Sequence, residues 1–206
     1  MLRVVVLISG SGSNLQALLD DEHGYRVVAV VADRAAAGGL ARATQRDVPA
    51  LGVPLATPKD HAQRAAWEAE VTQVIHTFQP DLIVMAGWMR IMSPIFVAQF
   101  PNLINQHPAL LPPDGSDSIT LPDGQRIPAL RGAHAVRDAL RHGLAVTGCT
   151  VHRVTAEVDV GPVLAQAIVP IHPTDDEATL HERIKHAERR LIVQVVRELA
   201  AANPSL

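Results

Sequence analysis

Asn105 and His107 stand two residues apart in the segment Asn-Gln-His-Pro, at the end of a short apolar run. In an extended chain the side chains of residues i and i+2 point to the same side, so the amide and the imidazole are expected to face one crevice. Such a pair suits acyl transfer, because donors stabilise the oxyanion of the tetrahedral intermediate and an imidazole can also exchange a proton. The structural alternative is that both side chains finish a strand by hydrogen-bonding to nearby backbone.

A carboxylate that could accompany this pair is Asp159, in the segment Glu-Val-Asp-Val-Gly-Pro at residues 157–162. A carboxylate beside an imidazole can help to move protons during group transfer. Because Gly161 and Pro162 follow Asp159 so closely, turn formation explains the segment equally well.

A loop of small residues, Ser-Gly-Ser-Gly-Ser-Asn at residues 9–14, follows the first apolar run and opens a helix. Free N–H groups at a helix N-terminus favour a phosphate, although an ordinary strand-to-helix turn is also consistent with this loop. A Walker loop is excluded because no lysine is present. The dinucleotide fingerprint lacks its third glycine, where Leu15 stands, yet Asp33 lies where a ribose-binding acid belongs, so a nicotinamide enzyme is a second candidate.

Two further groups of residues could contact a ligand. Residues 89–92 follow another apolar run, and the alternative for this loop is a turn that caps the core. Lys185 and Glu188 are three apart on an expected helix and form either a surface pair or a ligand contact. No metal site is expected, because the ten histidines include no His-x-x-x-His pair.

The elements that must position these residues follow an alternating pattern. Apolar, β-branched runs at residues 3–8, 26–32, 82–86 and 103–105, with a weaker one at 52–55, are separated by helical patterns at 14–19, 40–46 and 62–78. Ser93 followed by Pro94 marks a further helix start. This order predicts a Rossmann-like α/β fold with an open, mostly parallel twisted sheet and helices on both faces. Ligands of such sheets bind beyond the carboxyl ends of the strands, where the candidate residues lie.

The second half of the chain differs. Runs at residues 146–154 and 163–171 are close enough in sequence to pair antiparallel, which makes the sheet mixed. Thr174 and Glu177 resemble a capping box before a long amphipathic C-terminal helix. Two Pro-Asp-Gly turns predict a small hairpin of residues 119–121 and 125–127. We expect residues 1–206 to form a single domain with this hairpin inserted at 113–128.

Composition limits the classes of protein and partner. Of 206 residues, 48% are apolar and 19% are charged, which excludes a disordered chain. The net charge of −3 predicts no bulk attraction to nucleic acid or to an anionic membrane, so an anionic ligand must be bound locally. The run at residues 3–8 is too short to span a bilayer, and the single Cys149 is expected in the core. These features predict a cytoplasmic protein.

Four motifs in order carry a resemblance to a known family. They are residues 8–16 (Ile-Ser-Gly-Ser-Gly-Ser-Asn-Leu-Gln), 86–94 (Ala-Gly-Trp-Met-Arg-Ile-Met-Ser-Pro), 105–112 (Asn-Gln-His-Pro-Ala-Leu-Leu-Pro) and 159–162 (Asp-Val-Gly-Pro). Together they resemble the phosphoribosylglycinamide formyltransferases, folate-dependent enzymes of purine synthesis. The resemblance runs from residue 2 to about residue 200.

The resemblance implies transfer of a formyl group from 10-formyltetrahydrofolate, as cosubstrate, to the amine of glycinamide ribonucleotide, without a metal. It implies that the catalytic residues are Asn105, His107 and Asp159. The residues that would bind the ribonucleotide are Gly12, Ser13, Asn14, Gly87, Lys185 and Glu188. Those that would bind the folate are Met89, Arg90, Ile91, Met92, Thr155, Ala156, Glu157 and Val158. The expected partners are therefore small molecules, for a monomer or a homodimer. Two alternatives stay open: a formyltetrahydrofolate hydrolase, and a noncatalytic nucleotide-binding or folate-binding module.

Two features depart from the family's pattern. The hairpin at residues 113–128 is extra, and our hypothesis is that it partly covers the active-site mouth or forms a subunit contact. Unchanged kinetics and oligomeric mass after deletion of residues 114–127 would contradict both versions. Gln106 replaces an apolar or small residue, and alternation should turn it away from the crevice.

Overall fold

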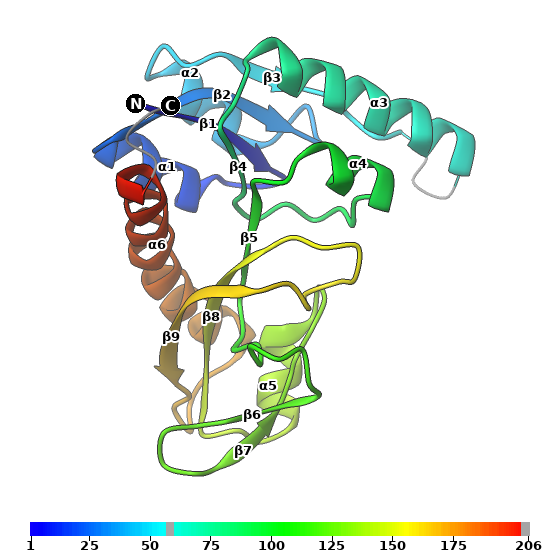
Figure 1. The fold of residues 1–206 in the computed structure, drawn as a ribbon. Coiled ribbons are helices and arrows are strands. Elements are labelled where there is room, and N and C mark those ends of the chain that lie inside the picture. Colours follow the sequence, from blue (N-terminus) through cyan, green and yellow to red (C-terminus); the bar gives the residue numbers. More distant parts are fainter. Residues whose placement is uncertain (57–59, 203–206) are drawn as a thin grey trace. The chain divides into compact units, whose positions relative to one another are not determined.

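The computed structural model describes residues 1–56 and 60–202 of the chain. They divide into two compact units (Figure 1). Unit 1 comprises Met1–Ile104 and the C-terminal residues from Val196 onward, and unit 2 comprises Asn105–Val195. That the whole chain acts as one domain stays a prediction.

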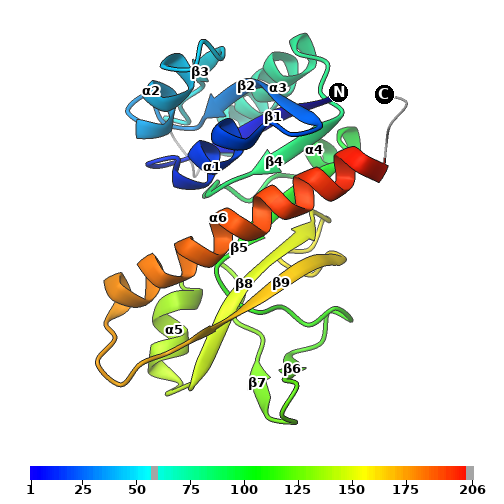
Figure 2. The same ribbon diagram turned by 90° about the vertical axis from the view of Figure 1, so that its left-hand side faces the viewer.

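Unit 1 contains a parallel sheet whose central strand is buried along most of its length. Its strands are β1 (Leu2–Ile8), β2 (Tyr25–Ala32), β3 (Ala50–Gly52) and β4 (Leu82–Met85). Its helices are α1 (Ser13–Asp21), α2 (Gly38–Thr44), α3 (His61–Thr77) and α4 (Pro94–Gln99). Strand β1 pairs in parallel with β2 and β4, and β2 pairs in parallel with β3. Figures 1 and 2 show α1 and α3 on opposite sides of β1 and β4, as the alternating pattern predicts.

The local signals of unit 1 are largely confirmed. Pro94 begins α4, and the Ser93 hydroxyl caps that helix by accepting a hydrogen bond from the Phe96 amide at 3.2 Å. The weak strand expected at residues 52–55 is placed earlier, at Ala50–Gly52. That strand is only three residues long, and its pairing with β2 fixes its position more than its own sequence does.

Strand β5 (Leu103–His107) belongs to both units, with its first two residues in unit 1 and its last three in unit 2. The complete seven-stranded sheet has the order β3-β2-β1-β4-β5-β8-β9. The predicted fold class, an open and mostly parallel sheet with a late antiparallel pair, is therefore confirmed. Strand β5 is two residues longer than its apolar run, because the polar residues Gln106 and His107 continue it.

Unit 2 is built on the antiparallel pair β8 (Val146–Arg153) and β9 (Val163–Pro170). The predicted hairpin is present as β6 (Ser118–Thr120) and β7 (Arg126–Pro128), a separate two-stranded ribbon (Figure 2). The helix α5 (Ala135–Arg141) follows the hairpin, and α6 (Glu177–Ala202) begins in unit 2 and ends in unit 1.

Two local predictions for unit 2 need correction. The capping box before α6 is formed by Asp176 and Thr179, whose side chains each accept a hydrogen bond from the other's amide, and not by Thr174 and Glu177. Helix α5 was not predicted at all. It has seven residues, and its N-cap residue His134 makes no side-chain capping bond, so the sequence carries no start signal there.

Gln106 is buried on β5, and among the residues that the structure describes its amide has no hydrogen-bond partner. Both Asn105 and His107 make contacts that Gln106 does not share, in agreement with its expected opposite direction. A buried amide without partners is a cost to stability, because its polar atoms lose water and gain nothing in return. No helix in the described ranges is long and apolar enough to cross a membrane.

We expect Gln106→Met to raise the free energy of unfolding by about 1 kcal/mol, because it removes unpaired polar atoms at similar volume. Urea unfolding of the two proteins measures this change. The matched control is Gln166→Met, which should destabilise the protein, since Gln166 donates to the Leu111 carbonyl oxygen at 2.8 Å and to Thr150 Oγ1 at 2.9 Å. Destabilisation by both substitutions would contradict the account of Gln106.

Candidate active site

The three residues expected to be catalytic meet in unit 2 around the carboxylate of Asp159. Asp159 Oδ2 lies 3.4 Å from His107 Nδ1 and accepts a hydrogen bond from the Gly132 amide at 2.8 Å. Its other oxygen, Oδ1, lies 3.5 Å from His152 Nε2. His152 Nε2 is in turn 3.2 Å from Asn105 Nδ2. Two imidazoles, one amide and one carboxylate thus form a continuous cluster.

The turn that carries Asp159 has a tightly constrained backbone. Asp159 has φ 55°, a left-handed conformation that aspartate and asparagine tolerate better than most residues. Two residues later, a Cβ at Gly161 would stand 1.9 Å from the Arg153 carbonyl oxygen, so only glycine fits there. The Arg153 amide donates to the Pro162 carbonyl oxygen at 2.9 Å, which closes the turn between β8 and β9. This segment therefore forms a tight turn and also places Asp159 in the cluster.

The Asp159 side chain is only 9% exposed, yet it is held in its ionised form. Burial by itself raises the pKa of this carboxyl, but the His152 ring, the charge of a protonated His107 and the Gly132 amide outweigh burial and lower the pKa to about 2. Asp159 is therefore a carboxylate throughout the neutral range. A fixed negative charge at this place stabilises positive charge that develops on either imidazole.

His107 is also buried, with 4% of its side chain exposed. Its Nε2 lies 2.6 Å from the Leu130 carbonyl oxygen, which only accepts, so Nε2 carries a proton and Nδ1 of the neutral ring is left to face Asp159. Burial lowers the pKa of His107 below its usual value of 6.5. Asp159 and the Leu130 carbonyl oppose that shift, and His152 and Arg131 add to it.

His152 was not among the residues expected from the sequence. Its Nδ1 donates to the Arg153 carbonyl oxygen at 2.9 Å. In the neutral ring Nε2 accepts from the Asn105 amide, and in the protonated ring Nε2 donates to Asp159 Oδ1. The contact with Asn105 fixes which way the Asn105 amide is turned. A signal existed in the sequence, because His152 is a polar residue near the end of a strand-like run, but only the neighbouring position of β5 and β8 in the sheet gives it meaning.

The cluster has the groups that acyl transfer needs. Asn105 Nδ2 has a second N–H besides the one directed at His152, and an amide N–H can stabilise an oxyanion. His107 Nδ1 can take up a proton, and the ion pair with Asp159 then stabilises the imidazolium. Among the described residues, no group of three or more His, Cys, Asp or Glu side chains is arranged to hold a metal ion.

In unit 1, the loop at residues 9–14 and the loop after β4 are locked together. The Ser9 hydroxyl accepts a hydrogen bond from the Met89 amide at 2.8 Å, and the Ser9 amide donates to the Gly87 carbonyl oxygen at 3.1 Å. Gly12 caps α1 with φ 73°, and a Cβ there would stand 2.6 Å from the Cα of Gly39. The expected loops for phosphate and folate are therefore held in a fixed relation within this unit.

Arginine side chains surround these loops. Arg42 donates through Nε to the Ser11 carbonyl oxygen at 2.8 Å, which brings a guanidinium to the loop that α1 follows. Arg64, which the sequence reasoning missed, donates to the Ile91 carbonyl oxygen. Glu68 is buried and accepts a hydrogen bond from the Ser93 amide at 3.1 Å. Helix α3 therefore holds both Ile91 and Ser93 in place. Ile91 itself is 63% exposed.

The nicotinamide alternative depended on Asp33, and the structure gives that residue another role. Asp33 Oδ2 accepts from Arg90 Nε at 2.5 Å, and the Asp33 side chain is completely buried. Leu15, which stands where the third glycine was required, belongs to the buried core. An acid that binds ribose hydroxyls must be open to the ligand, so Asp33 instead orients Arg90.

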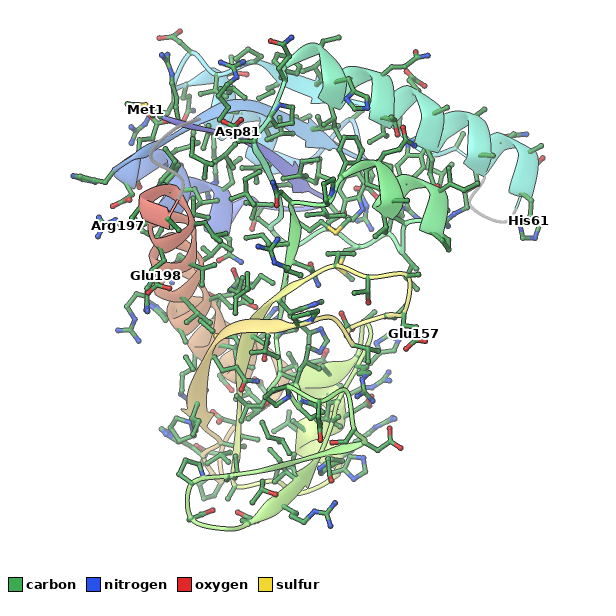
Figure 3. The ribbon with its side chains drawn as sticks, in the orientation of Figure 1. Met1, His61, Asp81, Glu157, Arg197 and Glu198 are labelled. Carbon is green, nitrogen blue, oxygen red and sulfur yellow. The ribbon has the colours of Figure 1, made fainter. Side chains whose placement is uncertain are left out.

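The remaining predicted residues lie in unit 2. Residues 155–158 are exposed in the turn that leads to Asp159, and Figure 3 shows the Glu157 side chain directed outward from that turn. On α6, Lys185 Nζ pairs with Glu182 Oε1 at 2.7 Å. Glu188 is buried, and burial together with the Glu188 charge raises the pKa of Cys149, the expected core cysteine, to about 12.

The fold and the cluster are those of an enzyme suited to acyl transfer, and comparison with known proteins gives its class. Residues 2–196 match the family described as Formyl transferase, and the chain belongs to that family. It is 46% identical over 202 residues to the phosphoribosylglycinamide formyltransferase of Mycobacterium tuberculosis, covering 96% of this chain and 85% of the relative.

Solved structures show the same likeness. The glycinamide ribonucleotide transformylase 1 of Symbiobacterium toebii superposes with a TM-score of 0.84 at 38% identity, over 98% of this chain and 89% of that one. The corresponding protein of Geobacillus kaustophilus gives a TM-score of 0.82 at 36% identity, over 97% and 99% of the two chains.

We expect the pKa of His107 to lie below 6.5 and to fall further in Asp159→Asn, because the carboxylate is what stabilises the imidazolium. The measurement is the pH titration of the His107 Hε1 resonance, assigned by its loss in His107→Asn. Asparagine also tolerates the left-handed backbone at this position, so the fold should persist. An unchanged or higher pKa in Asp159→Asn would contradict the described pairing.

Proposed function

We propose that the protein transfers the formyl group of 10-formyltetrahydrofolate to the amine of glycinamide ribonucleotide, giving formylglycinamide ribonucleotide and tetrahydrofolate in purine synthesis. The observation that supports this most directly is the buried cluster of Asn105, His107, His152 and Asp159 in a member of the formyl transferase family. Relatives named phosphoribosylglycinamide formyltransferase support the same substrates.

In this reaction the amine nitrogen forms a bond to the formyl carbon, and the bond from that carbon to the folate nitrogen breaks. The amine loses one proton and the departing folate nitrogen gains one, so no covalent enzyme intermediate is needed. We assign the oxyanion of the intermediate to the Asn105 amide, with the positive charge of the His107 ring adding to its stabilisation once Nδ1 has taken up a proton, because Nε2 already donates to the Leu130 carbonyl. Asp159 assists the proton transfer by stabilising the protonated His107 ring.

The substrate contacts are proposals carried by the family resemblance and by local geometry. Gly12, Ser13 and Asn14 would bind the phosphate, since they open a nine-residue helix beside the Arg42 guanidinium. Gly87, Lys185 and Glu188 complete the proposed ribonucleotide contacts. The proposed folate contacts are residues 89–92, which Ser9, Asp33 and Arg64 hold in place, and residues 155–158.

These substrates are small molecules, and we propose that the enzyme acts in the cytoplasm with a folate cosubstrate and without a metal. A hydrolase of formyltetrahydrofolate would use a similar donor but would pass the formyl group to water. The two activities differ in whether donor turnover depends on the amine.

We expect tetrahydrofolate release from 10-formyltetrahydrofolate to depend on added glycinamide ribonucleotide and to match formylglycinamide ribonucleotide formation mole for mole. Absorbance for the folate and mass spectrometry for the nucleotide, on one purified sample, measure both. Equal release with and without the amine would favour the hydrolase. No release in either case would favour a noncatalytic binding module.

We expect Asp159→Asn to lower kcat by about 10²-fold or more while the dissociation constants of both substrates change little, because Asp159 acts on the proton and not on binding. Asp138→Asn on α5 is the matched control, since among the described residues the Asp138 side chain forms an ion pair only with its neighbour Arg137. Near-normal turnover in Asp159→Asn would remove Asp159 from the mechanism.

A further inference from the structure

The inserted hairpin has a packed base. Leu121 and Ile127 are buried with Leu110, and Ile119 packs against the same cluster. The strands β6 and β7 pair in register across Ile119 and Ile127. Their hydrogen bonds and apolar contacts give this segment a defined position within unit 2.

Arg131, three residues after β7, joins the first part of the insert to the chain that leaves it. Its Nη2 donates to the carbonyl oxygens of Gly115 at 2.8 Å and Ser116 at 2.6 Å, and its Nη1 lies 3.3 Å from Asp117 Oδ1. The Arg131 side chain is 23% exposed. A guanidinium that binds two carbonyl groups through one nitrogen fixes both segments against each other.

The residues on either side of Arg131 are the ones that touch the catalytic cluster. The Leu130 carbonyl oxygen accepts from His107 Nε2 at 2.6 Å, and the Gly132 amide donates to Asp159 Oδ2 at 2.8 Å. The insert also approaches the turn of Asp159 directly, because a Cβ at Gly115 would stand 2.7 Å from Val160 Cγ1. Residues 130–132 therefore lie between the insert and both catalytic groups.

We infer that Arg131 is a positioning residue, which ties the insert to residues 130–132 and thereby holds the Leu130 carbonyl and the Gly132 amide on His107 and Asp159. The inserted hairpin then stabilises the catalytic groups indirectly, through the backbone of residues 130–132 that contacts them. The expected effect of Arg131 on kcat rests on the proposed function, whereas its expected effect on the pKa of His107 does not.

The charge of Arg131 also acts on His107. The charged or titratable groups that face His107 are Asp159 on the turn after β8, His152 on β8 itself and Arg131 after β7. Arg131 and His152 lower the pKa of His107, and Asp159 raises it. Removal of the Arg131 charge by itself raises the pKa of His107, but displacement of the Leu130 carbonyl lowers it and has the larger effect. A lysine at this position keeps the charge and should leave the pKa close to that of the parent.

The experiment compares three variants with the parent. Arg131→Met removes the charge and the hydrogen bonds, and Arg131→Lys keeps the charge with a single donor group. Arg126→Met is the matched control, because Arg126 lies in the same insert, is exposed and donates within the hairpin to Ser118 Oγ at 2.5 Å. Each variant is measured for kcat, for KM of both substrates, for thermal midpoint and for the pH titration of the His107 Hε1 resonance.

We expect Arg131→Met to lower kcat about tenfold with KM nearly unchanged, since a slight displacement of catalytic groups slows chemistry more than binding. The pKa of His107 should fall in the same variant, because the hydrogen bond to the Leu130 carbonyl raises that pKa more than the Arg131 charge lowers it. Arg131→Lys should restore the pKa and part of kcat, and Arg126→Met should match the parent in both.

Parent-like kcat and pKa in Arg131→Met would overturn the inference, and so would equal losses in Arg131→Met and Arg126→Met. If Arg131→Met does not fold, Arg131→Lys decides alone: a lowered kcat supports the inference and an unchanged kcat overturns it. If the parent does not transfer formyl groups to glycinamide ribonucleotide, the proposed function fails separately. The His107 titration then decides on the role of Arg131.

Discussion

The structure of the site depends on how a buried carboxylate is kept ionised. Asp159 is largely removed from water, which by itself favours the neutral acid. The Gly132 amide donates to this carboxylate, and the two imidazoles oppose the effect of burial when they carry a proton on the nitrogen that faces it. Each imidazole is held in turn by a backbone carbonyl, that of Leu130 for His107 and that of Arg153 for His152. Loss of a single partner would leave part of a charge uncompensated inside the protein.

This dependence explains why so much backbone around the site is unusual. Asp159 itself is in a left-handed conformation, and Gly161 permits a backbone approach that no side chain would allow. Gly132, whose amide donates to the carboxylate, also has a positive φ of 76°. The ring of contacts is thus maintained by main-chain geometry as well as by side chains, and strain of this kind is tolerated where the surrounding structure determines it.

The sequence predicts the elements of this protein better than it predicts their contacts. Alternation correctly places Asn105 and His107 together, because a strand period of two is a local property. Capping by Ser93 is equally local and equally well predicted. His152 could not be assigned in this way, because its role depends on which strand lies beside β5.

The same limit applies to backbone partners. Leu130 and Gly132 act through a carbonyl and an amide, and every residue except proline carries both groups. Nothing in their side chains could indicate a contact with His107 or Asp159. Helix α5 was missed because it lacks a side-chain cap, and the capping box of α6 was assigned to the wrong pair because two acceptable pairs lie within six residues. The resemblance to a family implies which residues are catalytic, whereas the structure shows which backbone groups hold them in place.

The central claim is that His107 works from a neutral ring with its proton on Nε2, so that Nδ1 is available beside the Asp159 carboxylate. The most direct test is a long-range 1H–15N correlation spectrum of the His107 ring at a pH of about 8, above the usual imidazole range. The account predicts a protonated Nε2 and an unprotonated Nδ1. A proton on Nδ1, whether in the other neutral tautomer or in an imidazolium at that pH, would contradict it.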